Sequence, residues 1–218
     1  MDYNKPTLLV ISGPNGAGKS TYINDMLPDT FEGIVSFDRD DTRSHFESQL
    51  KEEKVAEDQI SAIATRMMED RLSVTMNQAI EAHRHFVLET PLSHPDYWRY
   101  IDRFERNGYQ IQLCYLCLDK VSDCKVRVEH RVMMGGHHVD ARTIKGVYEM
   151  NLHHINLSLD TFQCIELYDG MIKPTLLVKI ENGEVILAKE SALKKTWVKT
   201  GLPLIATKTT AFLKLAKK

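Results

Sequence analysis

A glycine-rich run that ends in a lysine and a serine is the part of the sequence best suited to chemistry. The run Gly13-Pro14-Asn15-Gly16-Ala17-Gly18-Lys19-Ser20 matches the P-loop pattern G-x-x-x-x-G-K-[ST], and Thr21 completes the predicted nucleotide-binding set. The glycines let backbone N–H groups turn toward a phosphate, and a helix beginning here adds its positive dipole end. Lys19 would reach the β and γ phosphates, and the Ser20 hydroxyl would bind Mg²⁺. The motif predicts a nucleoside triphosphate site, with ATP and Mg²⁺ as the expected cofactors.

Two large P-loop classes lack their diagnostic motifs in this sequence. A GTPase reads guanine through N-K-x-D after a strand, whereas the pair Asn4-Lys5 precedes the first apolar run. A dimer-signature loop rich in serine and glycine, as in transporter ATPases, is also missing from the sequence. The pattern instead favours phosphoryl transfer to a small molecule. That reaction needs a carboxylate as base, a second carboxylate near Mg²⁺, and cations that close over the phosphoryl group.

Candidate carboxylates follow two predicted strands. Asp38 and Asp40 come after the run 34–37, and Glu89 follows the apolar run 85–88. Glu89 is a candidate Mg²⁺ ligand beside Ser20, and a buried acid without a cation partner would be costly. The alternative for the acidic turn is that Asp38 or Asp41 caps the next helix. Three polar residues follow Glu89, and they offer either substrate contacts or merely a turn: Thr90, Ser93 and His94.

Candidate cations lie on one predicted helix. Arg127 and Arg131 are four residues apart, so both side chains leave the same helix face. The pair Gly135-Gly136 and then His137 follow directly, which is typical of a lid that closes over phosphates. The alternative is an exposed helix whose arginines pair with Glu129.

The elements that must position these residues alternate between strands and helices. Apolar runs predict parallel strands at 7–12, 34–37, 86–88, 111–118 and 164–168, with helices at 20–26, 57–83, 96–106, 120–133 and 143–157 between them. An Asn-Gly turn joins 176–180 to 185–188 as a hairpin. We therefore expect an α/β fold of the P-loop NTPase class, nucleotide-kinase-like, with a mainly parallel sheet flanked by helices. Its kinase domain would span 1–190 with a lid at about 127–142, and 191–218 would be a C-terminal helical extension of the same domain.

The composition narrows the expected partners and location. A formal net charge of −2 over 218 residues gives no sign of nucleic-acid binding. The apolar run 8–11 is too short for a signal peptide, and no run is long enough to span a membrane. Cys114 and Cys117 form a C-x-x-C within a predicted strand, where they would point to opposite faces, so we expect free thiols and a cytoplasmic protein. The lysine-rich tail after 194 is interpreted as a solvated helix face, with docking of an acidic partner as the alternative.

Several of these segments together resemble the zeta-toxin family. The segments are Gly13–Thr21, Asp38-Arg39-Asp40, 89–93, Gly108-Tyr109 and Arg127–Val139, the last with the pattern Arg-Val-x-x-Arg-Val-x-x-Gly-Gly-His-x-Val. More narrowly, they are similar to the short bacterial branch of that family. The resemblance implies a fold like that of small nucleotide kinases. It also implies transfer of a phosphoryl group from ATP to the 3′ hydroxyl of the aminosugar of UDP-N-acetylglucosamine, with a small antitoxin as the protein partner.

The resemblance also implies roles for individual residues. Lys19 matches the phosphate lysine, Asp40 matches the base, and Arg127 and Arg131 lie in the region of the charge-stabilising arginines. The acidic turn usually reads Asn-x-Asp in the family, whereas this sequence begins it with Asp38. A further lid arginine is replaced by His137 or supplied by Arg131. Two alternatives remain open at this stage: a kinase of another small metabolite without toxicity, and a nucleotide-gated protein-binding module.

Overall fold

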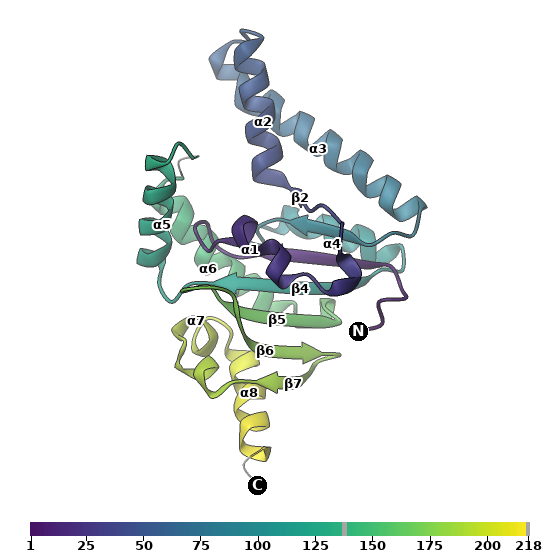
Figure 1. Cartoon of the computed structure of the whole chain (residues 1–218), viewed down its shortest axis with the longest axis vertical. Helices are drawn as coiled ribbons and strands as arrows, with labels where there is room; N and C mark the ends of the chain where they lie inside the picture. The colour runs from purple at the N-terminus through teal and green to yellow at the C-terminus, as the bar shows by residue number, and fades with distance from the viewer. Residues whose placement is uncertain (137–138, 217–218) are drawn as a thin grey trace.

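The computed structural model describes residues 1–136 and 139–216, and a single mixed sheet runs through it (Figure 1). Its strands are β1 (Thr7–Ser12), β2 (Phe37–Asp38), β3 (Phe86–Glu89), β4 (Gln110–Cys117), β5 (Cys164–Asp169), β6 (Thr175–Glu181) and β7 (Glu184–Ala188). They lie in the order β2-β3-β1-β4-β5-β6-β7. The first five in that order pair in parallel, and β6 and β7 add an antiparallel hairpin. The predicted α/β class with a mainly parallel sheet is confirmed.

The helices cover both faces of this sheet. They are α1 (Lys19–Met26), α2 (Arg39–Glu52), α3 (Glu57–Glu81), α4 (Pro95–Arg106), α5 (Val121–Met133), α6 (Ala141–Leu157), α7 (Thr196–Lys199) and α8 (Pro203–Leu215). Short 3₁₀ turns add η1 (Asp29–Phe31), η2 (Leu159–Thr161) and η3 (Glu190–Lys194). The chain moves from β1 to β2 and β3 on one side and to β4 on the other. The end of β1 is therefore the point where the strand order reverses, which is where α/β sheets bind ligands.

The sequence of β1 is apolar without interruption because both faces of this strand are buried. Leu8 and Val10 pack into the larger core beneath α4 and α6, whereas Leu9 and Ile11 pack into a second core beneath α1. All four side chains are fully buried. A central parallel strand is covered on both faces, so an alternating pattern would place polar groups in a core. The strand therefore carries the P-loop on a rigid, doubly packed support.

The two thiols of the C-x-x-C pattern behave as predicted. Cys114 belongs to the core on one face of β4 and Cys117 to the core on the other face. Both are buried and free. Residues three apart in a strand point in opposite directions, so the pattern does not build a disulfide or a redox pair here.

Helices α2 and α3 form an arm that projects beyond β2, at the top of Figure 1. A small core of its own holds the pair together, with Leu50 from α2 against Ile60 and Ala64 from α3. The helix α2 is otherwise polar, which is why apolar periodicity gave no helix over 39–52. The bounds of the predicted strand at 34–37 are wrong: β2 covers only Phe37–Asp38, and Asp38 also caps α2, so the strand ends there.

The C-terminal segment, residues 190–215, contains η3, α7 and α8 and packs beside the hairpin and α6. Trp197 of α7 is 2% exposed and its ring lies 6.0 Å from that of Tyr115 in β4. The segment therefore contributes to the main core and also approaches the sheet from the side opposite the α2–α3 arm (Figure 1). Of the helices that the structure describes, none is long and apolar enough to cross a membrane.

Candidate active site

The P-loop joins the end of β1 to the start of α1, which confirms the strand–loop–helix context of the motif. Gly13, Gly16 and Gly18 all have positive φ. At Gly13 an added Cβ would lie 2.1 Å from the backbone oxygen of Leu116, so only glycine fits against the end of β4. The first N–H groups of a helix have no partner within it, and α1 therefore presents donors to the loop interior.

Lys19 lies over this loop, as the motif predicts. Its ammonium donates to the carbonyl oxygens of Gly13 at 3.1 Å and Pro14 at 3.4 Å. The same nitrogen is 3.7 Å from a carboxylate oxygen of Glu89, and the side chain is 14% exposed. One mobile cation therefore stands between the loop and the first acid of the site.

Ser20 is the meeting point of two carboxylates from different strands. Its hydroxyl lies 3.2 Å and 3.1 Å from the two carboxylate oxygens of Glu89 and 3.2 Å from Oδ2 of Asp38. A hydroxyl has one proton, so it can donate to one of these oxygens at a time. The structure brings Ser20, Asp38 and Glu89 together from α1, β2 and β3.

Glu89 is held in an environment that disfavours its charge. Burial raises the pKa of the Glu89 carboxyl to about 7, and the negative charges of Asp38 and Asp40 act in the same direction. Lys19 and the Ser20 hydrogen bond oppose this effect. The carboxyl is therefore more easily protonated than an exposed glutamate, mainly because it is buried.

The donor set fits Mg²⁺. Ser20, Asp38 and Glu89 offer only oxygen atoms, which are the ligands that this hard cation takes. Magnesium is usually bound through one or two carboxylates together with substrate phosphates, rather than by a cage of protein ligands. A divalent cation beside the P-loop would favour the charged form of Glu89, which burial disfavours.

The two candidate acids of the acidic turn have different surroundings. Oδ1 of Asp38 accepts hydrogen bonds from the backbone N–H groups of Asp40 at 2.9 Å and Asp41 at 3.1 Å, so Asp38 is the cap of α2. Its other oxygen reaches Ser20. The Asp40 side chain is 66% exposed and lies 4.0 Å from the Arg43 guanidinium. Asp40 is exposed and lies near enough to Glu89 for its charge to act on that carboxyl, and its role as base stays a prediction.

Arg39, between these acids, is the residue that sequence reasoning missed. It is 8% exposed, donates to Glu69 of α3 at 2.6 Å, and lies 3.4 Å from the Thr90 hydroxyl. Its guanidinium also lies over the rings of Tyr97 at 4.8 Å and Tyr100 at 5.0 Å. Arg39 therefore holds the acidic turn against three elements: the end of β3, the middle of α3, and α4. The sequence could not predict this role for Arg39, because the residues that it contacts lie far along the chain.

The polar residues after β3 divide into two kinds. Thr90 is 1% exposed, its N–H donates to Ile11 at 3.1 Å, and its hydroxyl accepts from Arg39. Thr90 therefore supports the site through its buried contacts with β1 and Arg39. Ser93 is half-buried, and His94 caps α4 through the N–H of Asp96. Substrate contacts by Thr90 and Ser93 stay predictions.

The two candidate arginines of α5 are placed differently. Arg127 donates to the carbonyl oxygens of Ala17 in the P-loop at 3.4 Å and Met171 after β5 at 2.7 Å. Arg131 is exposed one turn further on and packs against Gly136, where α5 ends. His137 lies outside the described residues. Arg127 thus touches the nucleotide loop directly, and Arg131 lies on the same helix toward the predicted lid.

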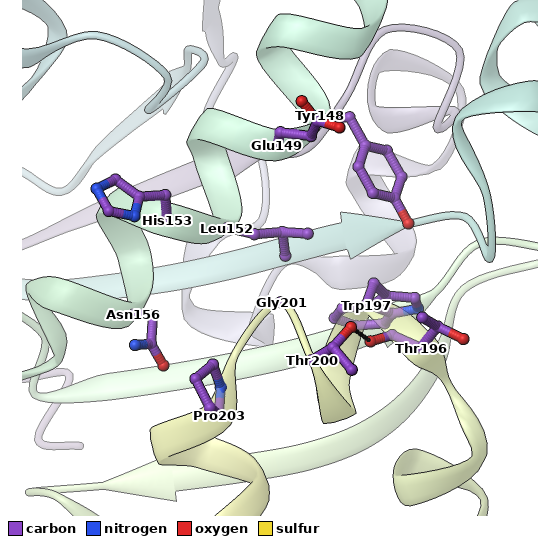
Figure 2. Close-up of a pocket in the computed structure, with 10 residues that line it drawn as sticks. All are labelled: Tyr148, Glu149, Leu152, His153, Asn156, Thr196, Trp197, Thr200, Gly201 and Pro203. Carbon is purple, nitrogen blue, oxygen red and sulfur yellow. Dashed lines mark hydrogen bonds between the residues drawn. The ribbon is translucent and has the colours of Figure 1, made fainter.

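A cavity of about 390 Å³ opens elsewhere, between α6 and the C-terminal segment (Figure 2). Its walls include Tyr148, Leu152 and His153 of α6 and Trp197 of α7. None of its lining residues belongs to the P-loop or to the acids beside it. The P-loop with its convergent acids and cations is the better candidate site, because it holds the groups that phosphoryl transfer requires.

The comparisons with known proteins agree with this geometry. The sequence model of the family described as Zeta toxin matches residues 1–165. The chain belongs to the zeta toxin family. That match covers all of the candidate site residues, from Gly13 to His137. No curated protein matches this chain.

Solved structures of two systems share the fold of this zeta toxin family chain. The complex AvrRxo1-ORF1:AvrRxo1-ORF2, solved with sulphate ions, aligns with a TM-score of 0.63 at 15% identity, over 88% of this chain and 63% of that one. The same complex with ATP gives a TM-score of 0.62. The PezAT chromosomal toxin–antitoxin system of Streptococcus pneumoniae gives 0.60 at 15% identity, over 98% of this chain and 88% of that one. This chain therefore spans less than two thirds of the AvrRxo1 chain, and the likeness establishes a shared fold.

Proposed function

We propose that the protein is an ATP-dependent small-molecule kinase that transfers the γ-phosphoryl group to a sugar hydroxyl of UDP-N-acetylglucosamine or a related UDP-sugar. The observation that carries the proposal is the Ser20 hydroxyl between Asp38 and Glu89, beside the Lys19 ammonium. Membership of the zeta toxin family supports the reaction type. The kinase-like fold supports it as well.

The nucleotide would lie in the P-loop. The backbone donors of 13–21 receive the phosphates, and Lys19 leaves the Gly13 and Pro14 carbonyls to bind the β and γ phosphates. Ser20 and Glu89, with Asp38 beside them, would hold Mg²⁺. When bound there, Mg²⁺ supplies charge neutralisation at the phosphate oxygens.

Asp40 would then act as the base. The hydroxyl oxygen of the acceptor forms a bond to the γ-phosphorus, and its proton passes to the Asp40 carboxylate. The bond between the γ-phosphorus and the bridging oxygen breaks, and ADP leaves with that oxygen. Arg127 and Arg131 stabilise the charge on the transferring group. The exposure of Asp40, together with the effect of its charge on Glu89, supports this assignment, because an acceptor must reach the base.

We also propose a small antitoxin as a partner and the cytoplasm as the location. Family membership supports this proposal. The similar structures also support it, since they include a toxin–antitoxin system and a complex of two different proteins. Expression of the chain alone should then arrest growth. Co-expression of the small protein encoded next to it should relieve that arrest.

The test is phosphate transfer in vitro. Purified full-length protein is incubated with Mg·ATP and UDP-N-acetylglucosamine, and the sugar nucleotide is analysed by mass spectrometry. Lys19→Ala removes the phosphate cation and should abolish both transfer and most ATP binding. Lys51→Ala, an exposed lysine of α2, is the matched control and should behave like the wild type.

Two outcomes contradict different parts of the proposal. A wild-type protein that binds ATP but leaves every UDP-sugar unmodified would overturn the acceptor and favour a kinase of another metabolite. A wild-type protein that fails to bind Mg·ATP, or a fully active Lys19→Ala variant, would overturn the whole assignment.

A further inference from the structure

A lysine of the C-terminal segment reaches back to the edge of the sheet where the candidate site lies. Lys195 stands between η3 and α7, and its ammonium lies 2.8 Å from Oδ1 of Asp119 and 2.7 Å from Oδ2 of Asp169. Asp119 follows β4 and Asp169 ends β5. The Lys195 side chain is 17% exposed, so one cation joins the carboxyl ends of two neighbouring strands.

The ion pairs keep this lysine charged. Burial by itself lowers the pKa of Lys195, but the hydrogen bonds and charges of Asp119 and Asp169 outweigh it and raise the pKa above its ordinary value. Each of the two carboxylates uses one oxygen to bind Lys195. The other oxygen of each carboxylate can therefore accept a second hydrogen bond.

The second oxygen of Asp169 positions the next residues of the chain. Its Oδ1 accepts from the N–H of Met171 at 3.2 Å, and the N–H of Asp119 lies 3.5 Å from the Met171 sulfur. The carbonyl oxygen of Met171 in turn accepts from the Arg127 guanidinium at 2.7 Å. A continuous path of contacts therefore runs from Lys195 through Asp169 and Met171 to Arg127.

The loop 170–172 also lies directly against the P-loop. A Cβ at Gly170 would be 3.0 Å from the carbonyl oxygen of Ala17, which is closer than ordinary van der Waals contact. The Tyr22 hydroxyl of α1 donates to the carbonyl oxygen of Ile172 at 3.2 Å. A shift of this loop would thus move both Arg127 and one wall of the nucleotide site.

Buried residues lie close to Lys195 on both sides of it along the chain. Trp197, two residues on, is 2% exposed in the main core. From α6, the Tyr148 hydroxyl lies within hydrogen-bond distance of the carbonyl oxygens of Leu118 at 3.0 Å and Asp119 at 3.2 Å, and it can donate to either of them. Figure 2 shows that Tyr148 of α6 and Trp197 of α7 both line the cavity between these helices. Lys195 therefore lies close to a buried residue of α7, and the backbone of its partner Asp119 contacts α6.

We infer that Lys195 is a positioning residue for the nucleotide site: through Asp169 and the loop 170–172 it sets the place of Arg127 against the P-loop. The inference rests on the proposed use of ATP and is independent of the acceptor. Lys195 lies beyond the residues 1–165 that the family model matches, so this link depends on the C-terminal segment. It makes that segment part of the nucleotide site's support.

The first test measures Mg·ATP binding to the full-length protein by calorimetry. Lys195→Met keeps most of the unbranched side chain and removes its charge, and we expect the dissociation constant to rise about tenfold, a usual size for coupling between sites. Lys195→Arg restores a cation between the two carboxylates and should bring the constant back to within about threefold of wild type. Lys199→Met, exposed on α7, is the matched control and should bind as the wild type does.

A double-mutant cycle distinguishes positioning from a merely structural ion pair. If Lys195 acts through Arg127, then Lys195→Met combined with Arg127→Met should bind Mg·ATP no more weakly than Arg127→Met alone. If the double variant showed the product of the two single losses of affinity, the inference would be overturned. Unchanged binding in Lys195→Met would overturn it as well. If Lys195→Met fails to fold, Asp169→Asn tests the same path with the same expected loss.

The outcomes separate this inference from the proposed function. A protein that binds ATP, loses affinity in Lys195→Met and phosphorylates no UDP-sugar would support the inference and contradict only the acceptor. A wild-type protein without affinity for Mg·ATP would overturn both.

Discussion

The Ser20 hydroxyl lies 3.1 Å from Oε2 of Glu89, so the last residue of the P-loop motif and the acid that ends β3 are direct neighbours. The two residues are far apart in the sequence. The parallel pairing of β1 with β3 brings them together. The contact places a carboxylate that is 7% exposed beside the predicted phosphate site. Its consequences for metal use can be measured.

Replacing Glu89 by glutamine should weaken the use of Mg²⁺. The amide keeps the size of the side chain and a hydrogen bond to Ser20, but it removes one anionic oxygen ligand. We expect the Mg²⁺ concentration for half-maximal turnover to rise about 10- to 100-fold. The melting temperature should not fall, because a buried neutral amide costs less than a buried charge. Glu81→Gln, exposed at the end of α3, is the control, and equal Mg²⁺ dependence in both variants would remove Glu89 from the metal site.

The two acids of the turn should respond differently to loss of charge. Asp40→Asn should keep the fold and near-normal ATP binding while turnover falls by about 10²–10⁴, the usual contribution of a positioned base. Asparagine is also a good helix cap, so Asp38→Asn should keep α2 intact while removing a charge beside Ser20. Asp41→Asn, exposed next to them, is the control. A fully active Asp40→Asn together with an inactive Asp38→Asn would assign the base to Asp38.

Arg127 and Arg131 should differ in how much they affect nucleotide binding. Arg127 contacts the Ala17 and Met171 carbonyls, so Arg127→Met should weaken ATP binding about tenfold and lower turnover by roughly 10³ or more. Arg131→Met should lower turnover with a smaller change in affinity, since Arg131 lies a turn away from the P-loop. Kinetics and calorimetry on both variants, with Lys125→Met on the same helix as control, give the comparison. Wild-type turnover in both arginine variants would assign the pair to the surface of α5.

Glu69 should contribute stability that depends on pH. Burial alone raises the pKa of Glu69, but hydrogen bonds from Tyr100 and Arg39 and the charges of Arg39 and Arg99 outweigh it and lower the pKa below its ordinary value of 4.5. Because the folded-state pKa is the lower one, this stabilisation is complete above about pH 5 and is lost as the pH falls through the folded-state value.

Glu69→Gln should therefore destabilise the fold by about 2 kcal/mol at neutral pH, since it leaves the Arg39 charge without its anionic partner. The difference from wild type in urea unfolding should shrink as the pH drops below 4.5. Asp70→Asn, exposed beside it on α3, should show no such trend. A difference that stays constant from pH 7 to pH 3 would mean that the Glu69 charge does not act through Arg39.

The sequence by itself determined the parts of the protein that depend on local pattern. Four consecutive apolar residues in β1 followed by the glycine loop and Lys19 predict a buried strand, a phosphate cradle and a helix, because each feature is set by neighbours along the chain. The alternation of strands and helices likewise determined the parallel sheet, and the Asn-Gly turn determined the hairpin. The C-x-x-C was correctly interpreted because side-chain direction in a strand alternates with every residue.

The tertiary structure alone decided which of these residues meet. Spacing along the chain does not show that Oδ2 of Asp38 reaches Ser20 while Asp40 faces solvent, since that depends on where α2 begins. It does not show that the polar run 39–52 is a helix, because α2 gains its stability from packing on α3 rather than from its own periodicity. The burial of Arg39 by Glu69 and two tyrosines, and the reach of Lys195 to Asp119 and Asp169, join residues separated by 26 to 76 positions. Such contacts form only when the sheet brings distant strand ends to one edge, and that arrangement is a property of the whole fold.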